Sequence, residues 1–143
     1  MTKRILIIDD NPDDIEAIKR FIANEAAYVR VVTDSKQSEV AFLEFEPDLV
    51  LLDLHMPAPD GATILRRLAP ARERLGFLPV IVLTGDHGAS ARDRALVLGA
   101  NDFLTKPLAR TDVLLRVRNM LRTRQLFVDL TNANRALERR AGL

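Results

Sequence analysis

Leu49-Val-Leu-Leu-Asp53 is an uninterrupted aliphatic run that ends in an acid. Pro47 lies just before this run, and the loop His55-Met-Pro-Ala-Pro-Asp-Gly61, which is rich in turn-forming residues, follows it. A short apolar run with such flanks is typical of a strand that is buried on both faces of a parallel sheet. The segment therefore predicts a central strand, residues 49–52, with Asp53 directly after its carboxyl end.

Four other short aliphatic runs alternate with stretches of helical periodicity. The expected strands are residues 4–8, 28–32, 49–52, a fourth that ends at Thr84 and a brief fifth within 101–107. Five helices are expected between and after these strands. The first starts at residues 11–14 and has Ile15, Ile18, Phe21 and Ile22 on its apolar face, and the second is capped by Asp34 or Ser35 and ended by Pro47. The third lies around 62–75, the fourth runs through Ala95 and Leu98 to Gly99, and the fifth is opened by Thr111 or Asp112. This alternation predicts an α/β fold with a parallel sheet covered by helices on both faces.

The composition predicts one domain with a short appendage. A chain of 143 residues, 48% of them hydrophobic, is long enough to bury a core, and the absence of cysteine excludes disulfides, thiolate zinc sites and thiol catalysis. No apolar run approaches the roughly 18 residues that cross a membrane, and the N-terminus leads straight into a strand. We therefore expect a cytoplasmic protein with no membrane partner.

Five polar residues stand at the ends of the expected strands: Asp9, Asp10, Asp53, Thr84 and Lys106. In open parallel sheets, ligands bind beyond the carboxyl ends of the strands, where the strand order reverses. Close carboxylates repel one another unless a cation joins them, and an all-oxygen cluster selects a hard ion such as Mg²⁺. An aspartate beside Mg²⁺ can attack a phosphoryl group, while a lysine and a threonine contact its oxygens. Taken alone, Asp9 and Asp10 would indicate only a helix cap or a turn; the joint placement favours a phosphoryl site.

The sequence resembles the receiver domains of bacterial response regulators over residues 3 to about 121. The resemblance is carried by four motifs: IIDDN (7–11), DLVLLDLHMPAPDG (48–61), PVIVLTG (79–85) and NDFLTKP (101–107). It implies a doubly wound, flavodoxin-like (βα)5 sandwich of three layers, with a parallel five-stranded sheet in the order 2-1-3-4-5. The corresponding domain division is a receiver domain, 1–121, and a C-terminal helical extension, 122–143.

The resemblance also implies a role for each acid. Asp53 matches the phosphoacceptor, Asp10 the direct ligand of Mg²⁺ (or Mn²⁺), and Asp9 the acid that holds metal-bound water. Asp53 would also contact the metal. His55 matches the position whose backbone carbonyl binds the metal, so no role is implied for its imidazole.

Further matches concern the switch and the phosphoryl group. Thr84 matches the switch hydroxyl, Phe103 the switch aromatic, and Lys106 the lysine that contacts the phosphoryl group; the bond before Pro107 matches a cis peptide.

Two features qualify the resemblance. Ala58-Pro59 stands where a glycine and an apolar residue are commoner, so that Pro57 and Pro59 stiffen the loop. His55 and Asp86 match positions that influence how water reaches the acyl phosphate.

The function implied is that of a response regulator receiver. It would accept a phosphoryl group from a sensor histidine kinase or a phosphotransfer protein, and it would catalyse only its own phosphorylation and dephosphorylation. Two alternatives keep the fold without this chemistry: a phosphorylation-independent interaction module, or a DNA-bound partner that uses a basic tail. A phosphatase with an aspartate nucleophile is disfavoured because His55 stands where such enzymes need a second Asp.

The tail continues the helical pattern beyond Leu121. Leu126, Leu130, Ala133 and Leu137 recur at the spacing of a coiled-coil seam. Residues 110–143 contain eight arginines against three acids, a net charge of +5, while the preceding residues carry −4. We interpret this charge as a solvated helix face rather than a nucleic-acid site. We expect a weak homodimer through this helix or a linker to an output domain; the alternative is a helix that folds back on its own domain or frays.

Overall fold

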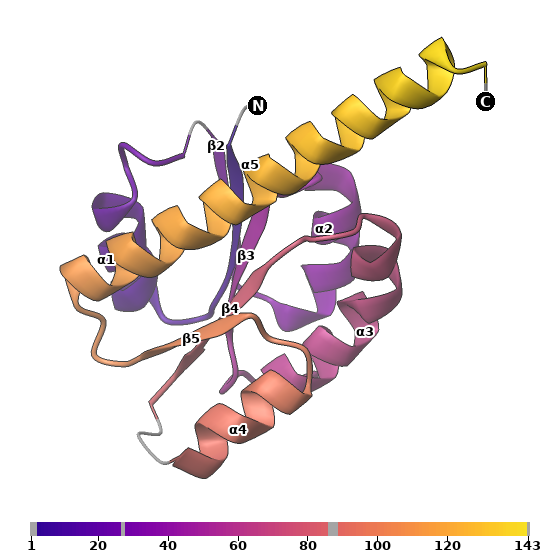
Figure 1. Cartoon of the computed structure of the whole chain (residues 1–143). Helices are drawn as coiled ribbons and strands as arrows, with labels where there is room; N and C mark the ends of the chain where they lie inside the picture. Colours follow the sequence, from indigo (N-terminus) through magenta and orange to yellow (C-terminus); the bar gives the residue numbers. More distant parts are fainter. Residues whose placement is uncertain (1–2, 27, 86–88, 143) are drawn as a thin grey trace.

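The computed structural model describes residues 3–26, 28–85 and 89–142. These residues include a five-stranded parallel sheet, which lies at the centre of the molecule (Figure 1). The strands are β1 (Arg4–Ile8), β2 (Tyr28–Val32), β3 (Leu49–Asp53), β4 (Val80–Thr84) and β5 (Asp102–Thr105). All pairs of neighbouring strands are parallel, and the strand order is β2-β1-β3-β4-β5. The expected α/β fold and strand order are confirmed.

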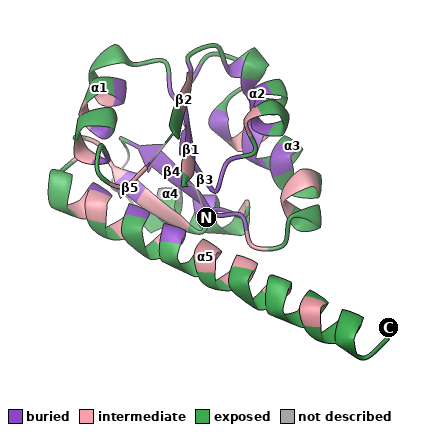
Figure 2. Ribbon diagram, turned by 90° about the horizontal axis from the view of Figure 1, so that it is seen from above, coloured by how far each residue is buried: buried purple, intermediate pink, exposed green. Residues whose placement is uncertain are grey.

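Helices cover both faces of the sheet. They are α1 (Pro12–Phe21), α2 (Ser38–Phe45, after the short 3₁₀ helix η1, Ser35–Gln37), α3 (Gly61–Arg74), α4 (Ala89–Val97) and α5 (Arg110–Arg140). Figure 2 shows α1 and α5 on one side of the sheet, and α2 and α3 on the other. These layers agree with the expected three-layer sandwich.

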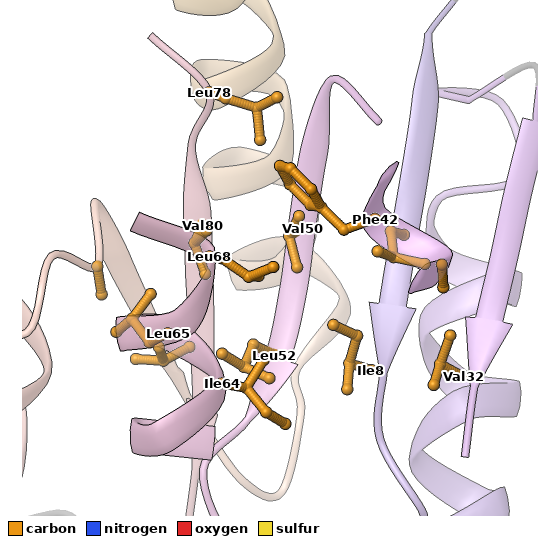
Figure 3. Packing of buried hydrophobic residues seen from close by; sticks show 14 of the residues in the cluster. Ile8, Val32, Phe42, Val50, Leu52, Ile64, Leu65, Leu68, Leu78 and Val80 are labelled. Atoms are coloured by element: carbon orange, nitrogen blue, oxygen red, sulfur yellow. The ribbon is translucent and has the colours of Figure 1, made fainter. Parts of the chain in front are cut away.

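Alternation of side chains along the strands divides the core into two halves. Ile5 and Ile7 of β1 pack with residues of α1 and α5, whereas Leu6 and Ile8 pack with residues of α2, α3 and α4. Figure 3 shows the second half, in which Phe42 of α2 lies among aliphatic side chains of the sheet and of α3. Because both faces are covered, β1, β3 and β4 are buried almost throughout, which explains their unbroken aliphatic sequences.

Side-chain caps start the first and third helices. Asn11 accepts hydrogen bonds from the backbone N–H groups of Asp13 and Asp14 at the start of α1, and Asp60 accepts from that of Thr63 at the start of α3. The prediction that Thr111 or Asp112 opens the last helix is wrong. α5 begins at Arg110 after Ala109, which provides no side-chain cap.

α5 continues without interruption to Arg140 and extends beyond the edge of the sheet (Figure 1). Its fully buried residues end at Leu121, so the expected boundary between 121 and 122 falls inside one continuous helix. The seam residues Leu126, Leu130 and Leu137 are exposed, so the seam itself does not pack against the domain. Within the described residues, no helix combines the length and apolarity that crossing a membrane requires.

Candidate magnesium and phosphoryl site

Three carboxylates meet at the carboxyl edge of the sheet, as the sequence predicted. β1 and β3 are neighbours with Ile8 opposite Leu52, so Asp9 and Asp10, which follow β1, lie beside Asp53 at the end of β3. One carboxylate oxygen from each acid lies within 4.8 Å of the others. Asp9 and Asp53 are buried and Asp10 is exposed. This set of hard oxygen donors, open on one side, fits a Mg²⁺ ion that retains several waters.

Asp9 is the acid of this cluster whose protonation is changed by its surroundings. Burial raises the pKa of Asp9 to about 6, and the negative charge of Asp53 adds to this effect. The backbone N–H of Asn11, which donates to Asp9 Oδ1 at 2.9 Å, and the charge of Lys106 act in the opposite direction. The ionised form of Asp9 therefore carries an electrostatic cost that a bound cation would relieve.

Lys106 reaches this cluster from the loop after β5. Its ammonium Nζ lies 2.7 Å from Asp14 Oδ2, 3.3 Å from Asp9 Oδ2 and 3.3 Å from Asp53 Oδ2. Burial lowers the pKa of Lys106, but the hydrogen bond to Asp14 and the negative charges around it outweigh burial, and the net pKa is raised. Lys106 is thus held as a cation directly beside Asp53.

Thr84 and His55 form the other side of the site. The backbone N–H of His55 donates to Asp53 Oδ1 at 3.0 Å, and the ring Nε2 lies 3.3 Å from Thr84 Oγ1. The imidazole of His55, for which no role was implied, is therefore in contact with the predicted switch hydroxyl. A cavity of about 240 Å³ adjoins this pair, and its lining includes Asp60, Arg94 and Leu98.

Residues 5–118 match the sequence model of the response regulator receiver domain. The chain belongs to this family. It is 34% identical over 122 residues to the response regulator GtcR of Aneurinibacillus migulanus, which corresponds to 85% of this chain and 49% of GtcR. It is 32% identical to the response regulator PleD of Caulobacter vibrioides over all 143 residues, or 31% of PleD. This receiver domain therefore spans half or less of the length of these relatives.

Solved structures support the same assignment. A putative response regulator from Chloroflexus aurantiacus superimposes with a TM-score of 0.76 at 27% identity, covering 85% of this chain and 98% of that one. The signal receiver domain of a putative LuxO repressor from Vibrio parahaemolyticus gives a TM-score of 0.81 at 22% identity, covering 92% and 98%, and supports the fold alone.

Phe103 of the receiver lies partly buried between two arginines. The guanidinium carbon of Arg92 is 4.6 Å from the ring centroid and that of Arg116 is 5.3 Å away. Arg116 is itself fixed by Asp102 at 2.6 Å and Asp112 at 2.9 Å. The ring is thus at the surface of the core, where it contacts charged groups on both α4 and α5.

Two predictions remain. Asp86 lies outside the described residues, whereas the predicted cis peptide before Pro107 is present. The Lys106–Pro107 peptide bond is cis, and Ala58–Pro59 is also cis. Sequence reasoning missed Asp14, which it placed only within the start of the first helix, residues 11–14. The available signal was its position in the first turn of α1, four residues after Asp10 and close to the strand end that carries the predicted site.

Proposed function

We propose that this receiver domain accepts a phosphoryl group on Asp53 in a reaction that depends on Mg²⁺ (or Mn²⁺). The observation that carries the proposal is the convergence of Asp9, Asp10 and Asp53 within 4.8 Å, with the Lys106 ammonium 3.3 Å from Asp53. Asp9, Asp10, Asp53 and the backbone carbonyl of His55 would hold the metal. Bound there, the ion would offset negative charge on the phosphoryl oxygens.

The chain's own groups supply the nucleophile and the contacts to the phosphoryl group. Transfer from a phosphohistidine breaks the N–P bond and forms an O–P bond on Asp53, and the imidazole nitrogen retains the electron pair of the broken bond. Lys106 and Thr84 would donate hydrogen bonds to the phosphoryl oxygens. The positive charge of Lys106 is already stabilised by the neighbouring carboxylates. Little reorganisation of this side chain is therefore needed when the phosphoryl group is transferred.

The proposed partners follow from the family. The phosphoryl donor is a sensor histidine kinase or a phosphotransfer protein. Because the curated relatives are two to three times longer than the matched segments, we propose that residues 122–143 link receiver 1–121 to an output domain or a partner. We further propose that Thr84 and Phe103 form the switch that carries the phosphorylation signal.

The test is phosphorylation by acetyl phosphate and Mg²⁺, followed by intact mass measurement and peptide mapping. We expect one acid-stable, base-labile phosphoryl group on Asp53, lost in Asp53→Asn and in wild type treated with EDTA. Asp10→Ala should lose Mg²⁺ binding and phosphorylation together, with Asp13→Ala as an exposed acidic control. A folded wild type that takes up no phosphoryl group would favour the alternative of a phosphorylation-independent interaction module.

A further inference from the structure

The ammonium of Lys106 is shared among three carboxylates, and the contacts are unequal. A lysine has three N–H donors, and here Asp14, Asp9 and Asp53 each lie within reach of Nζ. Only the 2.7 Å separation from Asp14 is the length of a short charge-assisted hydrogen bond, since the other two are 3.3 Å. Asp14 is therefore the principal partner of Lys106, although it lies outside the predicted metal cluster.

Asp14 is itself held in a fixed place. It lies in the first turn of α1, where its backbone N–H donates to Asn11 Oδ1 at 3.2 Å. Asn11 also donates its own backbone N–H to Asp9 Oδ1. The carboxylate that holds Lys106 is thus attached to the same short turn that positions Asp9, and α1 is anchored to the sheet by the buried Ile15 and Ile18.

We propose that Asp14 is a positioning residue for Lys106, which keeps the ammonium at the edge of the site with two donors directed toward Asp9 and Asp53. The proposal rests on the proposed function of Asp53. A lysine side chain has a flexible four-carbon stem and loses considerable rotamer freedom when it is fixed. The Asp14 contact fixes it before a phosphoryl group arrives, which matters because phosphoryl transfer depends mainly on positioned charge.

The first measurement does not require phosphorylation. Lysine ammonium groups give observable ¹⁵N NMR signals when ion pairing slows proton exchange, and the chain has only four lysines, Lys3, Lys19, Lys36 and Lys106. Lys106→Met assigns the signal in the metal-free protein. We expect this signal in wild type and in Asp13→Ala, the exposed neighbour on the same helical turn, and we expect its loss in Asp14→Ala. Equal behaviour of wild type and Asp14→Ala, with the signal present or absent in both, would overturn the proposal.

The second measurement separates positioning from binding. With saturating Mg²⁺ and varied acetyl phosphate, Asp14→Ala should lower the maximal rate constant about tenfold with little change in the donor concentration at half-maximal rate. Asp14→Asn keeps an acceptor oxygen and should restore most of the rate. If both variants instead bind the anionic donor more tightly and react as fast as wild type, Asp14 acts only through its charge and the proposal is wrong. Failure of wild type to take up phosphate would reject the function of Asp53, while the NMR result would still decide the role of Asp14.

Discussion

Gly76 lies directly under the aromatic ring of Phe127, so close that the ring leaves no room for a β-carbon. Gly76 follows the end of α3 with a φ of +77°, and Phe127 stands on the extension of α5. On the same corner, Arg124 donates from Nη1 to the backbone carbonyls of Leu75 at 3.2 Å and Phe77 at 2.9 Å. The first turns of the α5 extension are therefore packed against the loop between α3 and β4.

Gly76→Ala is expected to destabilise the protein by roughly 2–4 kcal/mol, because it adds a clash with Phe127 to the cost of a positive φ. Urea unfolding measures this change. Gly85→Ala is the matched control, since a β-carbon there would meet nothing within 4 Å. In the double variant Gly76→Ala/Phe127→Ala the two losses should be less than additive. Full additivity would show that the ring and the glycine are not in contact in solution.

A weak homodimer through the α5 extension remains a prediction, and the structure shows which exposed seam residues to substitute in order to test it. Leu126 and Leu130 are 62% and 67% exposed, so Leu126→Gln/Leu130→Gln should weaken association while Arg124 and Phe127 still hold the root of the extension. Matching arginines of a parallel pair repel each other, and salt screens this repulsion. Sedimentation at two salt concentrations should show a dimer that salt strengthens and the double substitution weakens. A wild type that stays monomeric at high concentration in both salts contradicts the prediction.

The raised pKa of Asp9 predicts an unusual pH dependence for the metal-free protein. Because the folded pKa of about 6 exceeds the unfolded value near 3.8, the folded state binds the extra proton between these limits. The free energy of unfolding should therefore fall as pH rises from about 4 to about 6, by on the order of 2–3 kcal/mol. The measurement is urea unfolding in EDTA across pH, with Asp9→Asn as the reference that lacks this step.

Added Mg²⁺ should restore stability above pH 6 in wild type and not in Asp9→Asn, because the ion binds the ionised cluster. A difference between the two proteins that does not change from pH 4 to pH 7 would show that Asp9 titrates normally.

Thr84→Ala is expected to accept a phosphoryl group nearly normally and to lose the response at Phe103. The hydroxyl would follow the phosphoryl group, and the ring would then leave its place between Arg92 and Arg116. The chain has no tryptophan, so Phe103→Trp supplies a single fluorescent reporter. Acetyl phosphate and Mg²⁺ should change the tryptophan emission of the single variant Phe103→Trp and leave that of the double variant Phe103→Trp/Thr84→Ala unchanged. Equal changes in both backgrounds would remove Thr84 from the switch.

The sequence alone was sufficient to predict the sheet and the three acids at its edge. Short aliphatic runs such as 4–8 and 49–52 form strands because a parallel sheet buried on both faces requires apolar side chains on both. The residues that directly follow such runs are then brought to one edge by topology, whatever the details of packing. This is why the sequence by itself groups Asp9, Asp10 and Asp53.

Contacts between elements that are far apart in the chain were decided only by the tertiary structure. Periodicity shows that Asp14 lies in a helical turn, but it does not show which lysine the carboxylate meets. The same limit applies to the ring of His55 against Thr84 and to Phe127 against Gly76, because each contact depends on how two rigid elements pack. The leucine spacing of the α5 extension predicted an apolar seam, and only the course of the whole helix past the sheet decided that this seam is left exposed.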